Sequence, residues 1–179
     1  MTWTHSHPEK ASHACSTPDV VIVGCGRWLR RDDQAGLIAA QMIEKSPPSG
    51  CVVVGTEAPT TDIPNLVENV QLLIIVDAAR SAEGHPPGTW QRMDYWTHKD
   101  HLAQRCRTDT HTLSVDLALR IAEEMGMLPP NVWIYAVTAE DCGYGEELSP
   151  VVARVIPEVT AQIESDISEF RAGREVCHA

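Results

Sequence analysis

The sequence predicts one three-layer α/β domain in which a mainly parallel sheet lies between two layers of helices. Short β-branched runs alternate along the chain with longer segments of helical periodicity, a pattern typical of β-α-β units. The run at residues 72–76 (LLIIV) is continuously apolar, which indicates a strand covered on both faces, as in a parallel sheet. The length of 179 residues suits one domain with its own core.

The first half of the chain is predicted to hold three strands and two helices. The first helix begins at about Asp33 and ends before Pro47, because proline in a helix interior removes a hydrogen bond. Thr61 or Asp62 is placed to cap a second, short helix that runs through Val67. The strands are expected at residues 20–23, 51–54 and 72–76.

The middle of the second half is predicted to hold two further strands and a long helix. Residues 89–93 follow a turn rich in glycine and proline, and we expect them to form an edge strand. Residues 111–124 are predicted to form a helix, because large apolar side chains recur every four positions along one side. Residues 132–137 are predicted to form another buried strand.

The last helix is predicted to begin at Ser149 and Pro150, an N-cap residue followed by proline at the first helical position. Its apolar stripe continues to Phe170, and Pro157 within it is expected to kink the helix or split it in two. We therefore expect the folded domain to span residues 19–171. Residues 1–18 are expected to be a disordered leader and residues 172–179 a disordered tail.

Composition excludes several classes of protein. Asp and Glu number 25 against 14 Lys and Arg, so the formal charge of −11 argues against a nucleic-acid-binding protein. No apolar run approaches the roughly 20 residues that cross a bilayer, and the first residues lack the apolar segment of a signal peptide. We expect a cytoplasmic protein that binds no membrane. The six cysteines include no C-x-x-C pair and are expected to be free thiols.

Three ionisable residues are predicted to meet at one edge of the sheet. Asp33 follows the first strand, Asp77 ends the strand at residues 72–76, and His111 begins a helix. Ligand sites in open parallel sheets form outside the carboxyl ends of the strands. Two carboxylates and an imidazole suit a divalent transition metal, and three protein ligands leave positions open for water or substrate.

Each of these residues also has a simpler interpretation. Asp33, or its neighbour Asp32, would favour the positive end of the following helix as a cap. A histidine at a helix start, such as His111, is commonly a capping or packing residue. Asp77 is harder to explain in this way, because a carboxylate at the end of a buried strand loses hydration unless something pairs with it. The metal site is favoured only when the three residues are taken together.

Two other functional classes stay open at this point. The turn Gly24-x-Gly26 is a weak match to a dinucleotide-binding oxidoreductase, because Leu29 stands where the third glycine is expected. A histidine-rich leader would suit a non-catalytic nickel metallochaperone. The polar segment at residues 138–147 is either a substrate loop or a solvated surface loop.

The sequence resembles the hydrogenase maturation proteases in several blocks that follow in order. The family pattern comprises G-x-G-N and D-[DE]-x-x-G, an apolar strand ending in D-A, a P-G, a histidine before a helix, and L-[ST]-P. A further form, G-x-x-P-E-N-D-I, is found in the branch that processes formate-hydrogenlyase-type hydrogenases. The matching residues here are 21–26 with 31–36, 55–63, 73–78, 87–89, 110–111 and 148–150.

The resemblance implies a five-stranded twisted sheet flanked by helices on both faces. It implies an aspartyl-type endopeptidase, expected to be a monomer, that removes the C-terminal extension of a [NiFe] hydrogenase large-subunit precursor once nickel is inserted. The family's catalytic, metal-binding acid, acid and histidine carry over to Asp33, Asp77 and His111. The nickel would be delivered by the precursor, so a resting enzyme would carry none, although other divalent metals would fit the site.

The sequence departs from the family pattern at two places. Arg27 replaces the Asn of G-x-G-N, and residues 54–57 replace a D-G-G/S, so the role of that Asp is unfilled or passes to Glu57. Hydrolysis by metal-polarised water and hydrolysis by a carboxylate general base both remain open. No Ser or Cys with a neighbouring base stands out as a nucleophile, which argues against a covalent acyl-enzyme.

Overall fold

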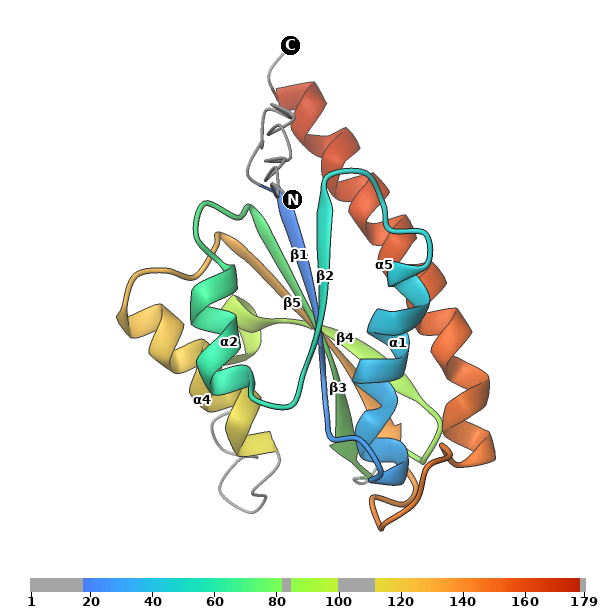
Figure 1. The fold of residues 1–179 in the computed structure, drawn as a ribbon. Helices are drawn as coiled ribbons and strands as arrows, with labels where there is room; N and C mark the ends of the chain where they lie inside the picture. The colour runs from blue at the N-terminus through green and yellow to red at the C-terminus, as the bar shows by residue number, and fades with distance from the viewer. Residues whose placement is uncertain (1–17, 82–84, 100–111, 178–179) are drawn as a thin grey trace, which may run out of the picture.

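The computed structural model describes residues 18–81, 85–99 and 112–177. Within these residues a five-stranded sheet has the order β2-β1-β3-β5-β4, and all pairings are parallel except that of β4 with β5 (Figure 1). The elements are β1 (Val20–Cys25), η1 (Arg31–Gln34), α1 (Ala35–Glu44), β2 (Cys51–Thr56), α2 (Pro59–Leu66), β3 (Leu72–Arg80), β4 (Trp90–Asp94), α4 (Thr112–Glu124), β5 (Asn131–Ala139) and α5 (Pro150–Cys177). The predicted three-layer fold and its mainly parallel sheet are confirmed.

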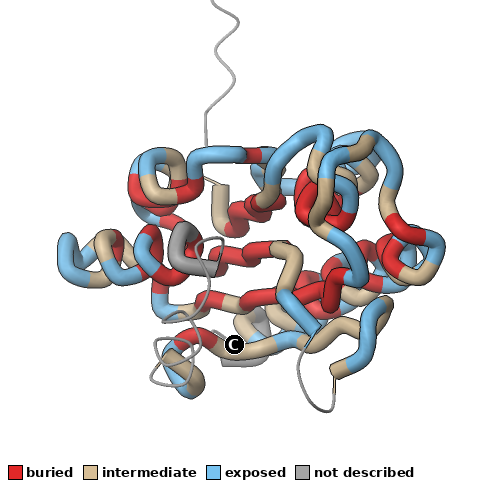
Figure 2. The backbone as a smooth tube through the Cα atoms, turned by 90° about the horizontal axis from the view of Figure 1, so that it is seen from below, coloured by how far each residue is buried: buried red, intermediate tan, exposed pale blue. Residues whose placement is uncertain are grey.

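Helices cover both faces of the sheet and create two separate cores. Helices α1 and α5 pack on one face, and α2 and α4 pack on the other (Figure 1). Successive side chains of a strand point to opposite faces, so each central strand contributes to both cores. Ile22 and Ile74 belong to the core under α1 and α5, whereas Val23 and Ile75 belong to the core under α2 and α4. Figure 2 shows the strands as a buried band between helices with exposed outer sides.

The burial of β3 explains its uniform apolar sequence. Leu72 through Val76 are fully buried, because β1 lies on one side, β5 on the other, and helices cover both faces. β3 stays paired with β5 for its whole length, from Leu72 opposite Asn131 to Arg80 opposite Ala139. β4 is an edge strand, as its sequence predicts.

Three local predictions need correction. The first helix is preceded by the 3-10 turn η1, so Asp33 lies before α1 rather than inside it. α2 begins at Pro59 with Ala58 at its N-cap, so neither Thr61 nor Asp62 caps it. α5 continues through Pro157, so the proline does not split it in two, and buried side chains on both sides of the proline hold the helix on the sheet.

The domain boundaries differ from expectation at the C-terminal end. α5 runs to Cys177, so residues 172–177, expected to be a disordered tail, are helical. The leader at residues 1–17 lies outside the described residues, as does the expected helix start at His111. In the described part of the chain, no helix is both long and apolar enough to span a membrane.

Candidate active site

The strand order places a crevice between β1 and β3. The chain continues from β1 to its neighbour β2 on one side, and from β3 towards β5 on the other. Such a reversal leaves an opening at the carboxyl ends of the two strands, where open α/β sheets bind their ligands. The loops after β1 and β5 both lie at this lower end of the molecule in Figure 1. Asp33 lies in η1, which follows β1, and Asp77 lies in β3, so the two residues are carried by the chain segments that border the opening.

Asp77 lies at the point where β3 leaves β1. Gly24 opposite Val76 is the last pair between the two strands, whereas Asp77 is still paired with Ala136 of β5. Loss of hydration, and secondly the charge of Asp33, raise the pKa of the Asp77 carboxyl to about 7. The two carboxyl groups are therefore electrostatic neighbours, and Asp77 can hold a proton at neutral pH.

Asp33 is held in place by its backbone. It is 6% exposed, its N–H donates to the Arg30 carbonyl at 3.0 Å, and its carbonyl accepts from the Arg27 N–H at 3.3 Å. A Cβ added at Gly26 would lie 2.0 Å from the Asp33 carbonyl oxygen, and one added at Gly36 would lie 2.2 Å from that of Val76. The glycines of the G-x-G and D-D-x-x-G blocks thus allow η1 and α1 to approach β1 and β3 closely enough to place Asp33 beside Asp77.

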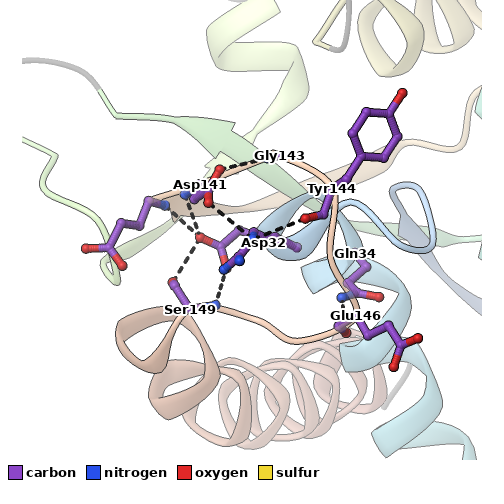
Figure 3. Close-up of polar contacts among 9 residues, drawn as sticks. Asp32, Gln34, Asp141, Gly143, Tyr144, Glu146 and Ser149 are labelled. Atoms are coloured by element: carbon purple, nitrogen blue, oxygen red, sulfur yellow. Dashed lines mark hydrogen bonds and ion pairs between the residues drawn. The ribbon is translucent and has the colours of Figure 1, made fainter.

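Asp32 has a structural role that the sequence did not reveal. Its buried carboxylate accepts hydrogen bonds from the N–H groups of Glu140, Asp141 and Ser149 at 2.7–2.9 Å, and from Ser149 Oγ at 2.9 Å (Figure 3). Ser149 directly precedes α5, so the Asp32 carboxylate stabilises the N-terminal end of α5. It does not cap α1, the helix that follows Asp32 along the chain. The prediction of Asp32 or Asp33 as a cap of the first helix is wrong, since that helix has no side-chain cap.

Further bonds tie the same two loops together. The Arg31 N–H donates to the Gly145 carbonyl at 3.1 Å, and the Gly145 N–H donates to the Leu29 carbonyl at 2.9 Å. Gln34 donates through Nε2 to the Glu146 carbonyl, and Figure 3 shows this contact beside the Asp32 cluster. The segment at residues 138–147 therefore fixes the loop that carries Asp33, which is more than a solvated surface loop would do.

The third predicted ligand, His111, lies outside the described residues, and α4 begins at the next position, Thr112. The structure thus brings together Asp33 and Asp77 and does not test His111. Among the described residues no group of three His, Cys, Asp or Glu side chains is arranged to hold a metal ion. The described part of the site is a pair of carboxyl groups.

Sequence reasoning missed two thiols around this pair. Cys25 is fully buried, and desolvation, then the charges of Asp77 and Asp62, raise its pKa. Burial, followed by the charge of Asp33, raises the pKa of Cys142 to about 11. Both thiols are therefore neutral and weakly nucleophilic at pH 7. Their environment depends on pairings distant in sequence, so no local signal marks them.

The carboxylate at the end of β2 is Asp62 rather than Glu57. Thr56, the last residue of β2, donates from Oγ1 to Asp62 Oδ2 at 2.5 Å and accepts from the Ala58 N–H at 2.9 Å. Glu57, which was one of the two alternatives for the missing family Asp, is exposed. The sequence marked Asp62 as a possible helix cap and as part of the block at residues 55–63, and neither signal indicated its bond to Thr56.

Comparison with known proteins identifies the family of this chain. The family model described as HycI, hydrogenase maturation protease, matches residues 40–166, which is more than half of the chain. The chain belongs to the hydrogenase maturation protease family. The matched region contains Asp77 and His111, whereas Asp33 precedes it. A search of curated protein sequences finds no match.

Solved structures of similar fold include members of the same family. The hydrogenase maturating endopeptidase HybD from E. coli has a TM-score of 0.71 at 20% identity, over 84% of this chain and 93% of that chain. The maturation protease HycI from Thermococcus kodakarensis KOD1 has a TM-score of 0.63 at 19% identity, over 83% and 91%. Membership makes this chain a peptidase of hydrogenase maturation, so the oxidoreductase and metallochaperone interpretations are set aside.

Proposed function

We propose that this peptidase removes the C-terminal extension of a [NiFe] hydrogenase large-subunit precursor after nickel insertion, and that Asp33, Asp77 and His111 bind the nickel of that precursor. The observation that carries most weight is the pair of neighbouring carboxyl groups at the β1–β3 crevice, Asp33 buried and Asp77 half-buried. Two carboxylates in a desolvated site repel each other, and a divalent cation would relieve both the repulsion and the loss of hydration.

The same electrostatics would couple recognition to maturation. A precursor without nickel brings no cation to the Asp33–Asp77 pair, so the pair contributes nothing to its binding. A nickel-loaded precursor would gain two oxygen ligands and, through His111, a nitrogen ligand of the type that suits nickel. The attacking water would be activated either by the metal or by one of the carboxylates acting as general base, since both groups lie at the crevice.

The proposal also places the reaction in the cytoplasm, with the monomer as the active form. The thiols of Cys25, Cys51 and Cys142 are free, as is usual in a reducing compartment.

Replacement of the three proposed ligands tests this site. We expect Asp33→Asn, Asp77→Asn and His111→Ala to abolish cleavage of a nickel-loaded precursor, measured as loss of the extension by mass spectrometry. Asp94→Asn, a matched change at the end of β4 and remote from the crevice, should cleave at the wild-type rate. Undiminished cleavage by any of the three site variants would remove that residue from the site.

A further inference from the structure

A groove lies beside the candidate site, between α1 and the outer edge of β2. It has a volume of about 370 Å³, in the range of roughly 300–1,000 Å³ typical of ligand pockets. Leu37, Ala40 and Gln41 of α1 form one wall, and Val53 and Gly55 of β2 form the other. A Cβ added at Gly55 would lie 3.4 Å from Leu37 Cδ2, which is an ordinary van der Waals contact. The backbone therefore does not require glycine at this position, but the absence of a side chain keeps the groove open.

The β2 wall has unused backbone hydrogen-bonding groups. Among the described residues β2 is an edge strand and pairs only with β1. The Thr56 carbonyl accepts from the Gly26 N–H at 3.2 Å and so points towards β1. Because successive residues of a strand direct their N–H and C=O groups to opposite sides, those of Val53 and Gly55 point to the free edge. An extended peptide could add to this edge as a further strand.

The charge lining the groove is negative. Glu44, Glu57 and Asp62 contribute carboxyl groups, and no Lys or Arg is among the described residues that line the groove. The whole chain carries a formal charge of −11, so the surrounding field has the same sign. A peptide with lysine or arginine side chains is the complementary occupant, and an acidic peptide would be repelled.

The groove lies beside the segment that leads to Asp33. Trp28, which lines the groove, lies between β1 and η1 and is 40% exposed. Asp33 lies in η1, directly after this segment. The same stretch of chain therefore contributes to both the groove and the candidate site.

We infer that the groove binds an extended, basic stretch of the precursor's C-terminal extension as an added strand along the outer edge of β2. This inference rests on the proposed function and gives it a second recognition element besides nickel. The backbone of Val53 and Gly55 provides affinity for any extended chain, while Glu44, Glu57 and Asp62 select for positive side chains.

Binding of two synthetic peptides tests the charge selectivity without any cleavage. The probes are a blocked hexapeptide of alternating valine and lysine and its counterpart of alternating valine and glutamate. We expect the lysine peptide to bind about tenfold or more tightly than the glutamate peptide. In hydrogen exchange, the amides of Val53 and Gly55 should gain protection and those of Val52 and Val54 should not change. Equal affinities, or protection at another strand, would overturn the inference.

Charge reversal identifies the residues responsible. Glu44→Lys combined with Glu57→Lys changes two exposed side chains and should weaken lysine-peptide binding about tenfold. Glu164→Lys combined with Glu169→Lys, on the exposed side of α5, is the matched control and should bind as the wild type. Gly55→Leu, which fills the groove, should abolish binding. Normal binding by both groove variants, or a dimer formed through β2 in sedimentation, would contradict the assignment.

Cleavage kinetics separate this inference from the proposed function. For nickel-loaded precursor, the Glu44→Lys, Glu57→Lys variant should show a KM about tenfold higher at unchanged kcat. An unchanged KM would show that the extension does not occupy the groove. If wild-type protein cut no precursor, the proposed function would fail, whereas the peptide measurements would still decide whether the groove selects basic strands.

Discussion

At the scale of single residues, the Asp33–Asp77 pair stores unfavourable electrostatic energy in the folded protein. Asp77 has an ordinary pKa of 3.8 and a folded-state pKa of about 7, chiefly because burial penalises its charged form. Each unit of difference between these two pKa values corresponds to about 1.4 kcal/mol of stability. The free energy of unfolding therefore falls as the pH rises from about 4 to about 7, and the full penalty is present above pH 7.

Asp77→Asn should therefore stabilise the protein while it removes activity. We expect the free energy of unfolding at pH 8 to rise by on the order of 2–4 kcal/mol, because the amide removes the buried charge. At pH 4 the gain should vanish, since the folded wild type then holds a proton on Asp77. Urea denaturation at the two pH values measures the effect, with Asp94→Asn as a control that should show no pH-dependent gain. A loss of stability at pH 8 would contradict the assigned burial.

The neighbouring Asp32 should behave in the opposite way. Its carboxylate oxygens accept hydrogen bonds from three backbone N–H groups and one hydroxyl. In Asp32→Asn one of these oxygens becomes an NH2 group, which would face N–H donors and could not accept from them. We expect a loss of about 2–4 kcal/mol in thermal or urea unfolding. Ser149→Ala removes only one of these bonds and should cost about 1 kcal/mol. Equal stability of Asp32→Asn and wild type would exclude the structural role.

At the scale of elements, the tight approach of α1 to the sheet is what positions Asp33. A Cβ at Gly36 would lie 2.2 Å from the Val76 carbonyl oxygen and 2.3 Å from that of Cys25, so α1 would have to move away from β1 and β3. Asp33 would move with it, because η1 leads directly into α1.

Two matched glycine substitutions test this steric requirement. Gly36→Ala should lower the free energy of unfolding by about 1–3 kcal/mol through overpacking, and should reduce cleavage at the same time. Gly173→Ala, in α5 where an added Cβ meets nothing within 4 Å, should instead stabilise by about 0.5–1 kcal/mol. Calorimetry of both variants decides the matter. Full activity and stability of Gly36→Ala would contradict the close approach.

The elements also show what the sequence could and could not predict. The strand at residues 72–76 and the amphipathic helix before Glu124 carry local patterns, so both were placed correctly within a few residues. The carboxyl group of Asp77 could be recognised because it ends such a strand. The partners of Asp32 lie more than 100 positions away along the chain, so no local pattern distinguishes its role from that of Asp33.

At the scale of the whole molecule, function follows from strand order. The order β2-β1-β3-β5-β4 opens a crevice between β1 and β3 and leaves β2 as a free edge beside it. Neither feature can be read from the order of elements along the chain, since pairing across the sheet is long-range. The resemblance to hydrogenase maturation proteases implied the five-stranded sheet, and the observed strand order confirms it.

The coupling of cleavage to nickel is the central claim, and one comparison tests it most directly. Wild-type protein is incubated with the same large-subunit precursor in nickel-loaded and nickel-free forms, and the product masses are followed over time. We expect loss of the C-terminal extension from the nickel-loaded form and an intact nickel-free form. Cleavage of both forms at the same rate would contradict nickel recognition by Asp33, Asp77 and His111.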